Sequence, residues 1–228
     1  MTYTVPRGAD PFGEPVIEAG LDAGPLPASP AARAVEAPTE LPCFVRGSRI
    51  ATTRGAVLVE DLQMGDRVLT RDNGFQDIRW IGSRRMAGTG KAAPVVIRGG
   101  ALGNVHDLCV SPLHHVLVSG WKAELITGER EVLVPAKALI DGAAIQRVTG
   151  PAVEYFHILF DAHQVILSDG VFSESFHPGH TGLAAFETAM RAEICDIFPE
   201  LSESGCAGYG TVARRVLKPH EAALLRDL

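Results

Sequence analysis

The sequence predicts an all-β domain over residues 43–176, and three observations support this fold class. Short runs typical of β-strands recur at close spacing, turn residues separate them, and no long amphipathic helix interrupts them. The candidate strands lie at residues 49–53, 66–71, 76–82, 94–97, 107–110, 115–118, 131–135, 144–148, 154–160 and 164–167.

Glycine-containing turns lie between these runs, where a positive φ costs little. They are Arg54-Gly55, Asp72-Asn73-Gly74, Gly99-Gly100, Asp141-Gly142 and Asp169-Gly170. Glu60-Asp61-Leu62 predicts a single helical turn between two strands.

Residues 1–41 predict a flexible, partly extended leader, because proline recurs there without apolar periodicity. The prolines are Pro6, Pro11, Pro15, Pro25, Pro27, Pro30 and Pro38. We therefore expect three parts: the leader, a main domain at 42–180 and a C-terminal extension at 181–228.

In the C-terminal extension, apolar residues recur every three or four positions, and this spacing predicts an amphipathic helix. These residues are Leu183, Phe186, Met190, Ile194 and Ile197. Thr181 is the expected N-cap, Pro199 ends the helix, and a short helix follows Pro219. We expect this extension to pack on the β-domain.

Composition argues against several classes of partner. The formal net charge is -6, the pI is about 5.7 and 46% of the residues are hydrophobic. Neither nucleic acid nor an anionic membrane is therefore expected as a partner. The four cysteines, at 43, 109, 195 and 206, form no disulfide framework and no C-x-x-C pair.

Residues 1–20 lack the basic start and apolar run of a Sec signal peptide, and the apolar stretches are too short to span a membrane. We expect a protein that is soluble where it is made. Its compartment stays open between the cytoplasm and export by a route without an N-terminal signal.

Cys43 lies where the proline-rich leader meets the β-rich part of the chain. It opens the segment Cys43-Phe44-Val45-Arg46-Gly47-Ser48-Arg49-Ile50-Ala51-Thr52, and a second segment, residues 59–70, contains the turn Gly65-Asp66. A free cysteine is most often a small buried residue. Its thiolate, however, is intrinsically nucleophilic.

This pattern resembles the start of a Hint module, the self-processing domain shared by inteins and Hedgehog C-terminal domains. The resemblance implies an all-β, horseshoe-shaped fold of two pseudo-symmetric halves whose ends meet at a central cleft, here with a helical appendage. It also implies that Cys43 attacks the peptide bond that precedes it, Pro42-Cys43, with the protein's own N-terminal segment as substrate in a single-turnover cleavage.

Ser111 and His114 are similar to the family's T-x-x-H motif, with serine in place of threonine. The resemblance implies that His114 gives a proton to the departing nitrogen of Cys43, because imidazole can supply one near neutral pH. Ser111 would orient the imidazole or polarise the carbonyl. Since neighbouring strand residues point to opposite faces, we interpret His115 as a packed or surface residue outside the site.

Residues 153–170 are similar to the closing motifs of inteins. His163 falls on a family histidine, Asp169-Gly170 falls on the Asn-Gly turn, and His157 falls where inteins often carry an aspartate that assists the thiol. Both histidines are therefore assisting site candidates. A purely structural role, capping or filling a strand, stays open for each.

The chain departs from splicing inteins at the end of the module. It has Phe172-Ser173-Glu174-Ser175 where they have His-Asn, and no asparagine follows Asn104. Asparagine cyclisation, and hence splicing, is not expected. The remaining chemistry is an acyl shift to a thioester, which water, a thiol or an amine resolves. Pro42 is expected to slow it, because the ring restricts how the carbonyl is presented.

Two alternatives stay open. The chain is either active or a catalytically retired β-scaffold that serves as a binding module. The cluster His106, Asp107, Cys109, His114 and His115 also suggests zinc, but it lacks an established ligand spacing. The expected site therefore contains neither a metal nor another cofactor.

Overall fold

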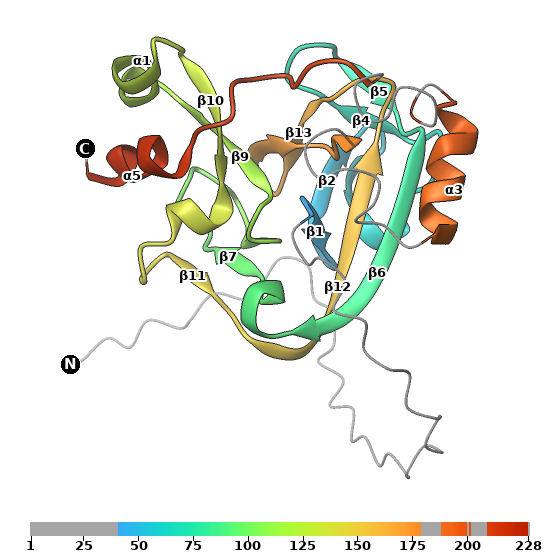
Figure 1. The fold of residues 1–228 in the computed structure, drawn as a ribbon, viewed down its shortest axis with the longest axis horizontal. Coiled ribbons are helices and arrows are strands. Elements are labelled where there is room, and N and C mark those ends of the chain that lie inside the picture. Colours follow the sequence, from blue (N-terminus) through green and yellow to red (C-terminus); the bar gives the residue numbers. More distant parts are fainter. Residues whose placement is uncertain (1–40, 179–187, 200, 202–208, 228) are drawn as a thin grey trace, which may run out of the picture. The chain divides into compact units, whose positions relative to one another are not determined.

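The computed structural model describes residues 41–178, 188–199, 201 and 209–227 (Figure 1). The predicted leader lies almost wholly outside these residues, as does Thr181, the expected N-cap. Within them, two β-sheets account for most of the secondary structure.

The first sheet has six strands in the order β11-β7-β8-β1-β12-β6, and its strand pairings are antiparallel. Its long strands β12 and β6 lie side by side (Figure 1), with Leu159 opposite Trp80. The bounds are β1 Phe44–Val45, β6 Trp80–Gly88, β7 Val95–Ile97, β8 Leu108–Val110, β11 Ile145–Arg147 and β12 Gly150–Leu159.

The second sheet has eight strands in the order β10-β9-β14-β13-β2-β4-β5, with β3 also paired to β2. Its strand pairings are antiparallel as well. The bounds are β2 Arg49–Thr52, β3 Gly55–Leu58, β4 Arg67–Leu69, β5 Phe75–Asp77, β9 His115–Ser119, β10 Glu131–Pro135, β13 Val165–Ser168 and β14 Val171–Glu174.

The turn between β13 and β14 needs glycine at its second position. Asp169 has a φ of 49° and Gly170 a φ of 91°. A Cβ built on Gly170 would lie 2.8 Å from the backbone nitrogen of Val105, too close for any other residue. The expected turn at Asp169-Gly170 is therefore present, and β14 follows it.

Helices are few and short among the described residues. The expected turn near Glu60 is the 3-10 helix η1, Val59–Asp61. The others are η2 Gly90–Ala92, η3 Ala136–Leu139, α1 Trp121–Thr127, α3 Thr188–Ile197 and α5 Pro219–Asp227. None of these helices is long and apolar enough to cross a bilayer.

The C-terminal helices agree with their predicted ends. Helix α3 ends at Ile197, before Pro199, and α5 begins at Pro219. Strands β1, β3 and β14 and helix α1 were not predicted from the sequence. Helix α1 has only seven residues and ends at Gly128 in a left-handed cap, so it is too short to show clear periodicity.

Two hydrophobic cores form. The larger is made mainly of residues of the two sheets. The second joins the start of the domain to the C-terminal extension, and its buried residues are Leu41, Cys43, Trp80, Val153, Tyr155, Leu159, Phe176, Ile194, Phe198, Leu201 and Tyr209. Helix α3 lies along β6 (Figure 1), and the indole nitrogen of Trp80 donates to Glu193 of α3. The extension therefore packs on the β-domain, as expected.

Candidate functional site

Cys43 lies directly before β1 and is 4% exposed. Strand β1 is short, but it is held on both sides: Phe44 lies opposite Phe156 of β12 and opposite Val110 of β8. Because of these two pairings, Ser111, which follows β8, and His157 of β12 lie next to the peptide bond between Pro42 and Cys43.

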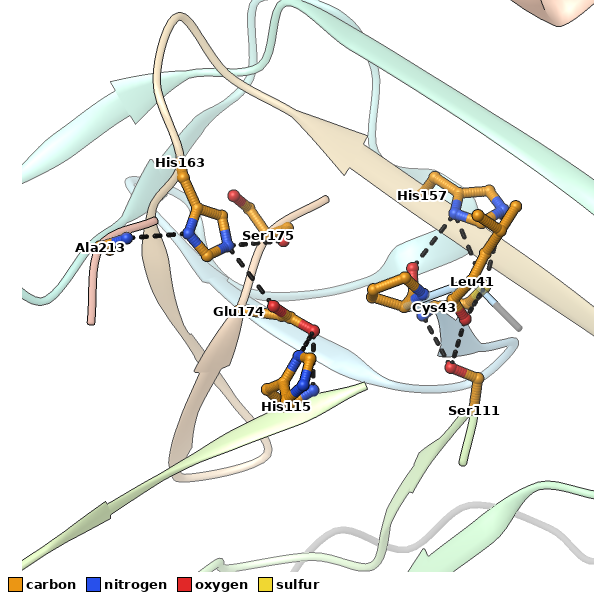
Figure 2. Close-up of polar contacts among 10 residues, drawn as sticks. Leu41, Cys43, Ser111, His115, His157, His163, Glu174, Ser175 and Ala213 are labelled. Carbon is orange, nitrogen blue, oxygen red and sulfur yellow. Dashed lines mark hydrogen bonds and ion pairs between the residues drawn. The ribbon is translucent and has the colours of Figure 1, made fainter. Parts of the chain in front are cut away.

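Three atoms at this bond have polar neighbours (Figure 2). The Sγ of Cys43 lies 3.1 Å from the carbonyl oxygen of Leu41 and 3.6 Å from each ring nitrogen of His157. The carbonyl oxygen of Pro42 lies 3.2 Å from Nδ1 of His157. The backbone nitrogen of Cys43 donates to Oγ of Ser111 at 3.0 Å.

Ser111 follows β8 and contacts the chain on both sides of this bond. Its backbone nitrogen donates to the Cys43 carbonyl at 2.9 Å, and its hydroxyl donates to the Leu41 carbonyl at 2.6 Å. With the bond that its oxygen accepts from Cys43, these contacts fix the segment that contains the nucleophile candidate.

Burial determines the charge state of the thiol and of His157. It raises the pKa of Cys43 well above its ordinary value, so the thiol is neutral. It lowers the pKa of His157 from 6.5 to about 4, so the imidazole is neutral too. Because a carbonyl oxygen only accepts, the contact with Pro42 places the ring proton on Nδ1 and leaves Nε2 as a proton acceptor.

His114 is buried, and its ring packs edge-on against Phe44 with centroids 4.5 Å apart. Neither of its ring nitrogens has a hydrogen-bond partner among the described residues. Burial lowers the pKa of His114 to about 3, with the charge of Glu174 opposing this shift. His114 therefore packs beside the residue that follows Cys43, while Ser111 makes the contact with the Cys43 nitrogen.

His163 belongs to a second polar cluster (Figure 2). Its Nε2 lies 3.1 Å from the Ser175 carbonyl and 3.5 Å from Oε2 of Glu174, and its Nδ1 accepts from the backbone nitrogen of Ala213 at 3.0 Å. His115 contacts the other oxygen of Glu174, with Nδ1 at 2.5 Å. This cluster gathers residues of β9, β14 and the C-terminal extension.

The structure thus brings Cys43, Ser111 and His157 into direct contact and places His163 in the neighbouring cluster. Sequence reasoning missed Glu174 and gave His115 no partner. Both are buried, and the backbone N–H of His115 donates to Oε1 of Glu174. The only signal was a charged residue in the short run Phe172-Ser173-Glu174-Ser175, which carries no family motif.

The described part of the chain contains no set of ligands that supports the zinc alternative. No three side chains of histidine, cysteine, aspartate or glutamate are arranged there to hold a metal ion. His106, in the suggested cluster, is exposed, whereas His114 and His115 are buried.

Cys43 is thus a buried cysteine at the start of a domain made of two antiparallel sheets. A sequence model of the Hint domain family matches residues 42–180. The chain therefore belongs to the Hint domain family, and the predicted all-β Hint fold with C-terminal helices is confirmed.

The solved structures to which the chain is similar include an intein-like domain and inteins. A bacterial intein-like domain from Clostridium thermocellum is 16% identical, with a TM-score of 0.38 over 58% of this chain and 97% of that one. The MchDnaB-1 intein is 13% identical, with a TM-score of 0.39 over 58% and 98%. A DnaB intein from Synechocystis sp. PCC 6803 is 15% identical, with a TM-score of 0.37 over 59% and 98%. No curated protein sequence matches the chain.

Proposed function

We propose that this Hint domain cleaves its own chain at Pro42-Cys43 by an N-to-S acyl shift. One observation supports this most directly. The Cys43 sulfur and the carbonyl oxygen and nitrogen of the Pro42-Cys43 peptide bond each lie against a group suited to its part in the reaction. His157 faces the sulfur and the oxygen, and Ser111 faces the nitrogen.

His157 is the proposed base and carbonyl activator. Its neutral ring takes the thiol proton on Nε2 while Nδ1–H donates to the Pro42 oxygen. The sulfur then bonds to the Pro42 carbonyl carbon, and negative charge gathers on the oxygen beside the imidazolium. A thiol with a raised pKa needs such a base in contact with it.

Collapse of this intermediate breaks the bond between the Pro42 carbonyl carbon and the Cys43 nitrogen. The nitrogen must gain a proton to leave as an amine, and His114 is the proposed donor. Ser111 holds the nitrogen and keeps the Leu41 carbonyl in place. The products are a thioester between Pro42 and the Cys43 sulfur and a free amine on Cys43.

The thioester is then hydrolysed by water or passed to an external thiol or amine. The acyl group is the protein's own N-terminal segment, which ends at Pro42. Splicing does not follow, because the chain has no asparagine after Asn104 to cyclise. His163 assists from the second cluster without touching the reacting atoms.

Mass spectrometry of the purified chain incubated with thiol tests this proposal. A C-terminal fragment beginning at Cys43 should appear, and Cys43→Ala should abolish it. Cys195→Ala is the matched control, since Cys195 is a partly exposed free cysteine on α3 and should leave cleavage unchanged. The same fragment persisting in the Cys43→Ala protein would overturn the assignment.

The second candidate is a retired Hint scaffold that binds a partner. Its support is the deep burial and raised pKa of the thiol, together with Pro42 as the acyl residue. On a denaturing gel after thiol treatment, a single full-length band supports the retired scaffold, and two bands support the self-cleaving domain.

A further inference from the structure

Glu174, the last residue of β14, is a carboxylate only 1% exposed. A buried charge is costly unless it is paired and hydrogen-bonded. Oε1 of Glu174 accepts from the backbone nitrogen of His115 at 2.8 Å and contacts its ring, while Oε2 lies 3.5 Å from Nε2 of His163. Burial alone would raise the pKa of Glu174, but the contacts with His115 and His163 outweigh it and lower this pKa, so the carboxylate stays ionised.

Ala213 of the C-terminal extension determines which ring nitrogen of His163 accepts and which one donates. Because the backbone N–H of Ala213 donates to Nδ1 of His163, Nδ1 is an acceptor and a ring proton lies on Nε2. That proton points to the Ser175 carbonyl and to Glu174 (Figure 2). Residues far apart in the sequence thus converge on one carboxylate.

This carboxylate holds the peptide unit that joins His114 to His115. Glu174 accepts from the N–H of that unit, and the backbone nitrogen of Ala136 donates to its carbonyl, on His114, at 2.9 Å. The peptide plane next to the His114 ring is therefore held from both sides. Strand pairing adds to this, since Ser173 lies opposite Val116.

The charges around His114 come from several elements. Glu174 of β14 favours the protonated imidazole, whereas His115 of β9, His157 of β12 and His163 oppose it. Burial opposes it most, so His114 needs a nearby anion to act as a proton donor. Of the charged groups that act on His114, Glu174 is the anion.

We propose that Glu174 is a positioning residue for the acyl shift: it fixes the backbone of His114 and supplies the anion that lets this histidine carry the departing proton. The inference rests on the proposed function. It assigns a role to the residue that stands where splicing inteins have their terminal His-Asn.

Glu174→Gln tests the charge while keeping the shape, because the amide oxygen can still accept from His115. At saturating thiol, we expect the cleavage rate at pH 7 to fall about tenfold, the effect of one pKa unit. The acid limb of the pH–rate profile should move to lower pH, because the pKa of His114 lies below that of His157 and therefore sets this limb. Glu174→Asp, which keeps the charge, should leave that limb near its wild-type position. Glu129→Gln, at an exposed site, is the matched control.

A fall in rate with an unmoved acid limb would overturn the proposal, since lost stability alone lowers the rate without moving the limb. Folding of each variant is checked by circular dichroism.

A second measurement separates this inference from the proposed function, because it needs no cleavage. In Cys43→Ala protein with labelled histidine, the ring resonances of His114 are followed by NMR from pH 7 toward the acid limit of folding. Adding Glu174→Gln should delay the onset of the His114 titration to lower pH. An unchanged onset overturns the inference even if the wild type cleaves. Absent cleavage with a delayed onset rejects the proposed function alone.

Discussion

At one end of the Hint domain, Ser111 accepts from the nitrogen of Cys43 and His157 contacts the carbonyl oxygen of Pro42. At the other end, Ser175 accepts from the nitrogen of Gln164 at 3.0 Å and His163 contacts the carbonyl oxygen of Ser175 itself. Each end thus has a buried hydroxyl and a buried imidazole on backbone atoms. Only the first pair lies on a peptide bond with a thiol beside it.

This difference shows that a hydroxyl and an imidazole do not by themselves make a reactive site. At the second end they contact the backbone that flanks β13 and β14 and lie near the carboxylate of Glu174, and none of these contacts among the described residues involves a thiol. The same residue types therefore support chemistry at one end and structure at the other. Substitutions at matched positions test this contrast.

The largest effect is expected for His157→Gln. Glutamine keeps an N–H donor but cannot take the thiol proton, so the cleavage rate should fall about 10²–10⁴-fold, the usual loss for a missing general base. Single-turnover cleavage followed by gel at pH 7 measures this. The matched control is His220→Ala, at an exposed position on α5, which should cleave at the wild-type rate. A His157→Gln rate within threefold of wild type would remove His157 from the mechanism.

Ser111→Ala should have the next largest effect. It removes the group that holds the Cys43 nitrogen and the Leu41 carbonyl, and we expect a loss of about 10–10²-fold. Ser111→Thr keeps the hydroxyl and restores the family's usual residue, so its rate should stay close to that of wild type. Equal rates for the alanine and threonine variants would contradict this role.

The buried groups at the two ends should lower the stability of the fold in different pH ranges. The pKa values of His157 and His114 fall from 6.5 in the unfolded chain to about 4 and about 3 in the folded domain. Between these values the unfolded state binds more protons, so this stability is fully present above pH 6.5 and is lost as the pH falls toward 4 and below. The lowered pKa of Glu174 adds a further loss only below 4.5.

Urea denaturation of the Cys43→Ala protein between pH 7 and pH 4 measures this loss. The free energy of unfolding should decrease as the pH falls below 6.5, and His157→Gln should make the decrease shallower. The same slope with and without His157 would contradict its burial as a neutral ring.

The smallest effect on cleavage is expected at the second end. Ser175→Ala leaves the buried nitrogen of Gln164 without its acceptor and should destabilise the fold by about 1–3 kcal/mol. Its cleavage rate should stay within about twofold of wild type, because Ser175 touches no reacting atom. Ser119→Ala, at an exposed position, should change neither stability nor cleavage. A Ser175→Ala protein that is stable but does not cleave would contradict the proposed difference between the two ends.

Local patterns in the sequence determined much of the fold. The turns at Asp72-Asn73-Gly74 and Asp169-Gly170, most strands and both described C-terminal helices were predicted, because turn chemistry and apolar periodicity act over a few residues. Strand β1 was missed because it has only two residues. The motif at Cys43 pointed to the family that the sequence model then matched.

Only the tertiary structure decided which polar side chains meet. His157 was an assisting candidate by resemblance, yet pairing of β1 with β12 places it against both the sulfur and the carbonyl of the bond before Cys43. Glu174 had no sequence signal, since its partners come from β9, the turn before β13 and, through His163, the segment near Ala213. Contacts between residues 50 to 115 positions apart depend on sheet register and burial, and short-range sequence patterns do not record these.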